Sequence, residues 1–167
     1  MNHFQATAGN RYHLSVGAVV RNEEGKICCH YFKSKFFSEV DRTLEDFYIL
    51  MRETVEPGES LEECLARGLK EEFGVTARLE SYLGSIVSHF PKESMDVEKT
   101  TLYFSCAFIS RDDTLRSHDD IESGSETRWV EPSLLMSKMK EQSARLNRED
   151  TDESIMIERA LEKMAAK

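Results

Sequence analysis

The sequence predicts an α/β fold, in which helices pack on the faces of a mixed β-sheet. The order of the expected elements is the main reason: several strands come first, a helix follows, more strands come next, and two helices end the chain. Elements in this order bury their apolar surfaces best as layers around a core. The 167 residues, of which 40% are hydrophobic, are enough for one such globular domain.

The first third of the chain is expected to form strands. Residues 12–21 are rich in β-branched and small residues, and a second strand pattern at 26–32 follows the turn at 22–25, so a β-hairpin is predicted. Residues 33–46 are mixed and charged, which favours a loop. Residues 46–55 are apolar and aromatic, and they predict another strand that runs into a proline-glycine turn.

A helix is predicted between Ser60 and Gly74, because both of its ends carry clear signals. Ser60 can cap the first turn, and Glu63 three residues later completes a capping box. Gly74 stands where a helix terminator belongs. Leucines recur every four residues and form one apolar stripe, which favours burial of that face of the helix. They are Leu61, Leu65 and Leu69.

Strand patterns resume after this helix. Residues 75–90 alternate well enough for one or two strands, and the polar stretch 91–99 is expected to be a connection. Residues 100–110 form the strongest strand pattern in the chain. Their near-continuous apolar run predicts a central place in the sheet.

The C-terminal part predicts a short strand, a helix that begins near Pro132, and an amphipathic helix from Ser154 onward. The hydrophilic stretch 141–153 between the two helices is the best candidate for a linker. We therefore expect residues 1–140 to form the main domain. Residues 141–167 are expected to form a linker and a helix packed on that domain.

Charge and cysteine content narrow the function classes. The formal net charge of -9 argues against a nucleic-acid polymer as partner, because phosphate binding needs clustered Lys and Arg. No cysteine belongs to a CxxC pair, so reduced thiols are expected rather than a zinc knuckle or a disulfide framework. The cysteines are Cys28, Cys29, Cys64 and Cys106.

The sequence also predicts a cytoplasmic protein without membrane contact. Its first ten residues are polar and do not resemble a signal peptide. No apolar run approaches the roughly 20 residues that cross a bilayer as a helix.

Acidic residues gather at both ends of the predicted helix. Glu59 precedes its first turn, and Glu71 and Glu72 lie on its last turn. Carboxylate oxygens are the ligands that hard divalent cations prefer, and a polyphosphate can supply the remaining oxygens. The first hypothesis is therefore a magnesium or manganese site that acts on a phosphorylated small molecule.

At these residues the sequence resembles the Nudix hydrolase family, whose signature is G-x5-E-x7-R-E-U-x-E-E-x-G-U, where U is apolar. Seven of the nine fixed positions match, and the resemblance extends over residues 12–140. The matching residues are Glu59, Arg67, Leu69, Glu71, Glu72, Gly74 and Val75. The resemblance implies an α/β/α sandwich with a mixed sheet, and it makes a homodimer an open possibility. It also implies metal-dependent hydrolysis of the diphosphate linkage in a nucleotide sugar, a dinucleoside polyphosphate or an NTP.

The resemblance also implies roles for individual residues. Glu59, Glu71 and Glu72 are expected to bind Mg²⁺ or Mn²⁺, and Glu71, Glu72 and Arg67 are expected to be catalytic residues. Arg67 is expected to orient a carboxylate through an ion pair, either with Glu71 or with Glu59. The predicted substrate-binding residues are Arg52, Lys99 and Tyr103. Of the neighbours Tyr103 and Phe104 on the expected central strand, one is expected to face the core and the other could stack on a base.

A catalytic base is expected from the acidic loop before the last strand. The candidates are Asp119, Asp120, Glu122 and Glu126. We favour Glu122 as a catalytic residue because of its place ahead of that strand.

Two fixed positions of the signature differ in this chain. Glu53 stands where the signature has its first glycine, and Gly68 stands where it has the glutamate after Arg67. Gly68 removes a carboxylate and weakens the helix by about 1 kcal/mol relative to alanine. Tight packing against another backbone would be a structural reason for it. One metal could still bind, since Mg²⁺ needs only one or two protein carboxylates.

The sequence leaves three hypotheses open. The first is a metal-dependent enzyme. The second is a Nudix-like binding or regulatory module that lost turnover through Gly68. The third is a scaffold that dimerises through its C-terminal helix, and it has no specific support in the sequence.

Overall fold

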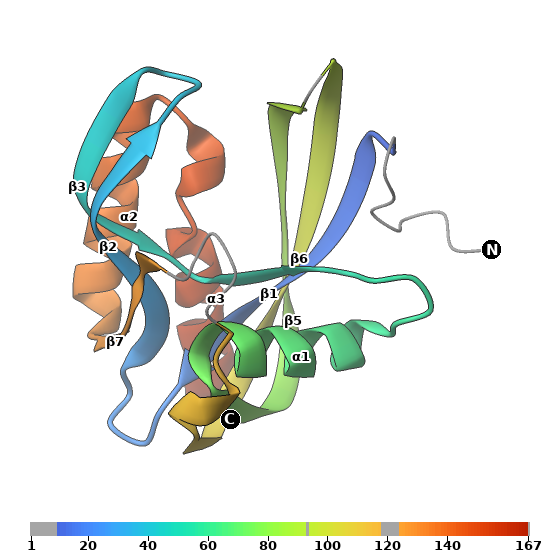
Figure 1. The fold of residues 1–167 in the computed structure, drawn as a ribbon. Helices are drawn as coiled ribbons and strands as arrows, with labels where there is room; N and C mark the ends of the chain where they lie inside the picture. Colours follow the sequence, from blue (N-terminus) through green and yellow to red (C-terminus); the bar gives the residue numbers. More distant parts are fainter. Residues whose placement is uncertain (1–9, 93, 118–123, 167) are drawn as a thin grey trace.

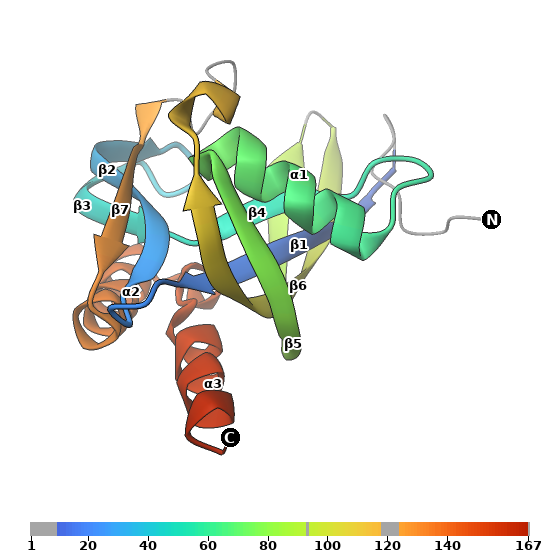
Figure 2. The same cartoon turned by 90° about the horizontal axis from the view of Figure 1, so that it is seen from below.

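The computed structural model describes residues 10–92, 94–117 and 124–166, and it shows a mixed sheet between helices (Figure 1). Helix α1 (Leu61–Phe73) covers one face of the sheet, and α2 (Pro132–Leu146) and α3 (Ser154–Ala165) lie on the other (Figure 2). The predicted α/β/α sandwich is therefore confirmed. The strands are β1 (Tyr12–Arg21), β2 (Ile27–Phe37), β3 (Arg42–Ile49), β4 (Met51–Thr54), β5 (Val75–Lys92), β6 (Met95–Arg111) and β7 (Glu126–Val130).

The strand order is β3-β2-β1-β6-β5, with β4 paired to β1 and β7 paired to β2. Strands β1 and β6 are parallel, and the other described pairs are antiparallel, so the sheet is mixed as predicted. Strand β6 lies between β1 and β5. Its interior place agrees with the apolar run that predicted a central strand.

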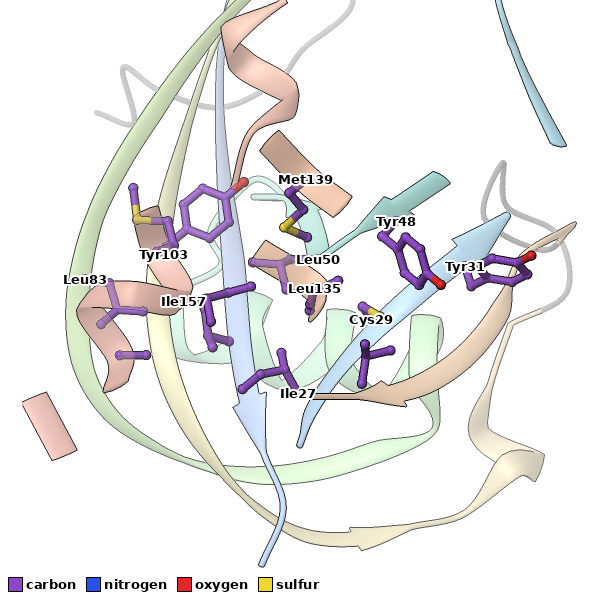
Figure 3. Close-up of a cluster of buried hydrophobic side chains, with 14 residues drawn as sticks. Ile27, Cys29, Tyr31, Tyr48, Leu50, Leu83, Tyr103, Leu135, Met139 and Ile157 are labelled. Atoms are coloured by element: carbon purple, nitrogen blue, oxygen red, sulfur yellow. The ribbon is translucent and has the colours of Figure 1, made fainter. Parts of the chain in front are cut away.

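The core has two main parts, one on each face of the sheet. Side chains alternate between the faces of a strand, and on β1 this puts Val16, Ala18 and Val20 against α1 and Val19 against the other helices. Figure 3 shows the second part, in which Leu135 and Met139 of α2 and Ile157 of α3 meet the sheet. Strand β1 is thus apolar on both faces because helices cover both.

Three polar stretches differ from their predictions. Residues 33–46, expected to be a loop, belong mostly to the β2-β3 hairpin, whose exposed positions hold the charges while Phe37 and Leu44 are buried. Residues 91–99, expected to be a connection, belong largely to the ends of β5 and β6. Polar residues in a half-exposed hairpin have a loop-like composition, although the backbone pairing is that of strands.

The expected linker at 141–153 is packed structure. Helix α2 continues to Leu146, and a short 3-10 helix, η3 (Glu149–Thr151), leads to α3. Gln142 is buried and hydrogen-bonded to the backbone of Tyr48, and Glu153 is fully buried. The hydrophilic residues of this stretch thus satisfy polar groups inside the fold.

The cysteines and the character of the helices also bear on the predicted class of protein. All four cysteines are buried and free, as the absence of a disulfide pattern predicted. In the described ranges, no helix has the length and apolar character that crossing a membrane requires.

Candidate functional site

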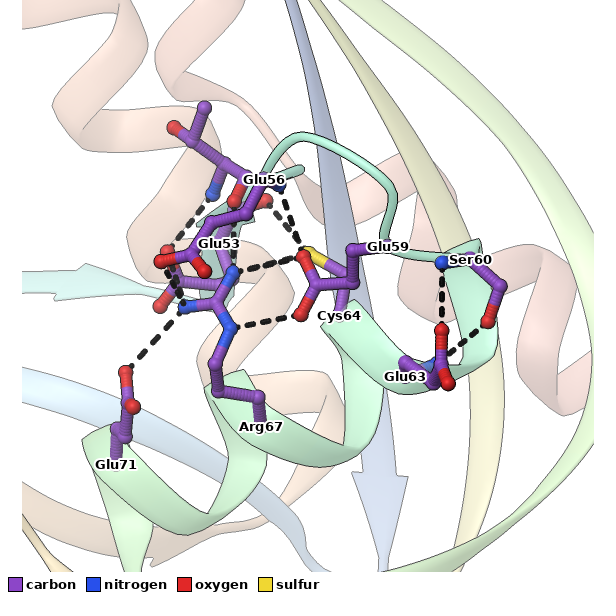
Figure 4. Close-up of polar contacts among 9 residues, drawn as sticks. Glu53, Glu56, Glu59, Ser60, Glu63, Cys64, Arg67 and Glu71 are labelled. Atoms are coloured by element: carbon purple, nitrogen blue, oxygen red, sulfur yellow. Dashed lines mark hydrogen bonds and ion pairs between the residues drawn. The ribbon is translucent and has the colours of Figure 1, made fainter. Parts of the chain in front are cut away.

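Helix α1 carries the candidate site, and both of its ends are fixed as predicted. The Ser60 hydroxyl accepts from the Glu63 backbone N–H at 3.2 Å, and the Glu63 carboxylate accepts from the Ser60 N–H at 2.8 Å (Figure 4). The helix ends at Gly74, whose φ of 64° is left-handed. A Cβ on Gly74 would lie 2.4 Å from the carbonyl oxygen of Asp112, so only glycine fits there.

The two sides of α1 differ in chemistry. Its apolar side packs on β1 and neighbouring strands, with Leu65, Leu69 and Phe73 all buried. This packing fixes the rotation of the helix about its axis. As a result, Arg67 and Glu71 lie together on a partly exposed side.

Arg67 lies at the centre of a cluster of carboxylates (Figure 4). Its Nε donates to Glu59 Oε1 at 2.8 Å, and its Nη2 donates to Glu59 Oε2 at 3.0 Å and to the carbonyl of Thr54 at 2.9 Å. Its Nη1 lies 3.3 Å from Glu53 Oε1 and 3.4 Å from Glu71 Oε2. Arg67 therefore joins the turn before α1, the strand β4 and the last turn of α1.

The cluster shifts the titration of two of its acids. The hydrogen bond from Arg67 lowers the pKa of Glu59 from 4.5 to about 2, so Glu59 is a carboxylate at any ordinary pH. Burial raises the pKa of Glu53 above its ordinary value, although Arg67 opposes part of this shift. Of these two acids, Glu53 is thus the one that takes up a proton first as pH falls.

Glu72 occupies a different environment from its neighbour Glu71. It is buried, and its Oε2 lies 2.6 Å from His30 Nε2 on β2. The other ring nitrogen of His30 lies 2.7 Å from the Ser125 hydroxyl, which also accepts from Arg116 Nη2 at 3.1 Å. In the network these contacts favour, the Ser125 hydroxyl donates to Nδ1 and a neutral His30 donates from Nε2 to Glu72.

The pH dependence of stability is expected to reflect His30. Burial lowers the pKa of His30 from 6.5 to about 3, with the charge of Arg116 adding to the shift. Between these values the unfolded chain binds a proton that the folded chain does not, so the free energy of unfolding falls as pH falls, by up to about 1.4 kcal/mol per pH unit. Urea unfolding between pH 7.5 and 4.5 measures this slope.

His30→Gln is expected to flatten the slope in that window, since the variant has no imidazole to protonate. His89→Gln is the matched control, because His89 is exposed. Equal slopes for wild type and His30→Gln would contradict the prediction.

The predicted substrate-binding residues do not lie with the acids of α1. Arg52 alternates with Glu53 on β4 and points to the opposite face, where its Nε donates to Glu153 at 2.7 Å. Tyr103 is fully buried in the α2–α3 side of the core and also donates to Glu153. Lys99 lies on β6 opposite His13 and Ser88, on the same strand face as Tyr103. Tyr103 is therefore the member of the Tyr103–Phe104 pair that faces the core, and none of its surface is exposed for a base to stack on.

The candidates for the catalytic base belong to the acidic loop before β7. Asp119, Asp120 and Glu122 lie outside the described residues. Glu126, the remaining candidate of that loop, is exposed at the start of β7 and pairs with Arg128 at 2.9 Å. The assignment of Glu122 stays a prediction.

The sequence reasoning missed two site residues. No site role was predicted for His30, which is the buried partner of Glu72. Glu53 was treated only as a lost glycine, yet its carboxylate contacts Arg67. A signal for Glu53 did exist, since the two failed signature positions are a glutamate for a glycine and a glycine for a glutamate.

The donor chemistry of the cluster suits a hard divalent cation. Four carboxylates surround the single guanidinium of Arg67: Glu53, Glu56, Glu59 and Glu71. Mg²⁺ and Mn²⁺ prefer such oxygen ligands, and the surplus of acids over Arg67 leaves negative charge for a cation to neutralise. As the side chains are placed, no three metal-ligating side chains converge on one point within the described residues. Binding therefore requires acids to turn away from Arg67.

Comparison with known proteins places this site in a family. The family model described as NUDIX domain matches residues 11–149. No curated protein sequence matches the chain significantly. Among solved structures, a NUDIX hydrolase from Nitrosomonas europaea is similar with a TM-score of 0.58 at 18% identity, covering 92% of this chain and 88% of that one.

Two further solved structures share the fold. The E. coli ORF135 protein has a TM-score of 0.53 at 16% identity, with 97% of each chain covered. A MutT protein from Methanosarcina mazei Go1 has a TM-score of 0.52 at 22% identity, covering 84% of this chain and 96% of that one. Identities this low establish a common fold, while the family itself rests on the match over residues 11–149.

Proposed function

Because the chain belongs to the NUDIX domain family, we propose that it hydrolyses the diphosphate linkage of a nucleoside diphosphate derivative with the help of Mg²⁺ or Mn²⁺. Membership of the family supports a hydrolase of the pyrophosphohydrolase type. The proposal adds the metal and the substrate class, namely a nucleotide sugar, a dinucleoside polyphosphate or an NTP. The observation that carries it is the retention of Glu71 and Glu72 on the last turn of a helix whose Arg67 clamp is intact.

The acids take different parts in this proposal. Glu71 and Glu72 would hold the cation, Glu71 from the partly exposed side of α1 and Glu72 after its carboxylate turns from His30, which lies 2.6 Å from it. Glu59 was expected to be a metal ligand, but both of its oxygens accept hydrogen bonds from Arg67. We assign it instead to the positioning of Arg67. When bound, the cation would polarise the phosphoryl group that water attacks.

The proposal is tested with a substrate panel. Purified wild-type protein is incubated with nucleotide sugars, dinucleoside polyphosphates and NTPs, and release of nucleotide or phosphate is measured with Mg²⁺, with Mn²⁺ and with EDTA. We expect turnover of at least one class, its loss in EDTA, and its return when metal is added in excess. If no class of substrate shows metal-dependent turnover, the enzyme hypothesis is wrong. Binding of a nucleotide without turnover would favour the regulatory module.

A further inference from the structure

The two departures from the signature meet in the structure. A Cβ built on Gly68 would lie 2.6 Å from Glu53 Cβ and 3.0 Å from both Glu53 Cγ and Met51 Sδ. Real Cβ atoms do not approach other carbons at 2.6 Å, so a side chain at position 68 and the present side chain at position 53 exclude each other. The Glu53 side chain therefore explains why position 68 holds a glycine. The predicted tight packing is present, but the neighbour is a side chain rather than a backbone.

Strand β4 aims the Glu53 side chain toward α1. Glu53 pairs with Val16 of β1, and the alternation of the strand puts Met51 and Glu53 on the α1 side and Arg52 on the other. The Glu53 Oε1 accepts from the Thr54 N–H at 2.9 Å, which limits the motion of the carboxylate. The backbone of β4 thus places the Glu53 side chain against α1.

The carboxylate of Glu53 lies among the acids that surround Arg67 in the candidate site. It shares Arg67 Nη1 with Glu71, at 3.3 Å and 3.4 Å respectively. Residue 68 stands one helical turn before Glu72, on the same side of α1, and Glu53 covers this point. The side chain of Glu53 is 17% exposed, so it is not sealed from solvent.

We infer that Glu53 supplies from β4 the metal-binding carboxylate that the signature places at position 68 of α1. The inference rests on the proposed function for the identity of the bound ion, a divalent cation. A cation responds to the oxygen atoms and not to the strand or helix that brings them. Glycine and glutamate have thus exchanged positions across the contact between β4 and α1, and the number of acids is kept.

The first test measures metal binding without substrate. Mn²⁺ affinity is determined by electron paramagnetic resonance for wild type, Glu53→Gln and Glu62→Gln. Glu62 is the matched control, since it is an exposed acid of α1 and its change removes the same charge. We expect Glu53→Gln to weaken Mn²⁺ binding about 10-fold to 100-fold, and Glu62→Gln to change it less than about twofold, as suits a screened surface charge. Equal affinities for wild type and Glu53→Gln, or no Mn²⁺ binding by wild type, would overturn the inference.

The second test exchanges the two residues back. Glu53→Gly alone is expected to lose Mn²⁺ affinity, and the double variant Glu53→Gly, Gly68→Glu is expected to regain it to within about threefold of wild type. Gly68→Ala gives a readout of packing alone. It is expected to lower the melting temperature of wild type more than that of Glu53→Gly, because the Glu53 side chain is in the way only in wild type, whereas Met51 Sδ remains in both. A double variant no better than Glu53→Gly would count against the inference.

The outcomes separate this inference from the proposed function. If wild type hydrolyses no substrate while the Mn²⁺ pattern appears as expected, the function fails and the role of Glu53 stands. If wild type turns over a substrate while Glu53→Gln keeps full Mn²⁺ affinity, the function stands and the role of Glu53 fails.

Discussion

Glu153→Gln is expected to lower the free energy of unfolding by about 3 kcal/mol, because a buried charge pair loses one partner. Glu153 is fully buried, and its Oε1 accepts from Arg52 Nε at 2.7 Å and from the Tyr103 hydroxyl at 2.5 Å. Its Oε2 accepts from the Leu50 N–H at 2.8 Å. Glutamine removes the charge that neutralises Arg52 and presents an N–H to a site where every partner donates. A domain of this size has only about 5–15 kcal/mol of stability to lose.

Urea denaturation of wild type, Glu153→Gln and Glu158→Gln measures this effect. Glu158 lies on α3, the helix that begins just after Glu153, and is exposed, so its replacement is expected to stay within about 0.5 kcal/mol of wild type. If Glu153→Gln unfolds at the wild-type urea midpoint, the contacts of this buried carboxylate with Leu50, Arg52 and Tyr103 do not stabilise the fold.

Glu71→Gln and Glu72→Gln are both expected to lower kcat by at least about 100-fold, since loss of groups that only support metal ligands already lowers activity 10-fold to 100-fold. Their effects on stability should differ. The Glu71 side chain is 41% exposed, whereas that of Glu72 is 3% exposed and lies 2.6 Å from His30. Glutamine at 71 should leave the melting temperature near that of wild type, and glutamine at 72 should lower it by several degrees.

Both kcat and the melting temperature of the two variants are measured on the same protein preparations. kcat is measured on the best substrate of the panel with saturating Mg²⁺, and melting is followed by circular dichroism without metal. Glu62→Gln again serves as control, because it changes one acid of the same helix that contacts neither Arg67 nor His30 in the described network. Full activity in Glu71→Gln would remove this residue from the proposed metal site.

The sequence predicted α1 in detail because its signals are local. The cap at Ser60, the terminator at Gly74 and the apolar stripe each act within one or two turns, and the structure confirms all three. The predictions for 33–46 and 141–153 were wrong because neither depends on local signals alone. Residues 33–46 have the composition of a loop, since the exposed positions of the β2-β3 hairpin hold their charges. Polar residues of 141–153 have partners far along the chain, as when Glu153 accepts from the backbone N–H of Leu50 103 positions away.

The same distinction between local and distant contacts applies to the candidate site. The signature spacing predicted that Arg67 would pair with Glu59 or Glu71, and the structure shows contacts with both. The spacing could not predict the partner of Glu72, because His30 lies 42 positions earlier on a different strand. Nor could it show that Glu53 and Gly68 touch, since that contact depends on how β4 packs against α1.

The contact between Glu53 and Gly68 also constrains how such a sequence can change over time. Two glutamates cannot occupy these positions together, because their side chains would overlap. Two glycines would fit but would leave the cluster one acid short. A lineage moving between the two arrangements must therefore cross a step that is either strained or weak in metal binding. Positions 53 and 68 should accordingly be inherited as a linked pair, with each residue setting which replacements the other tolerates.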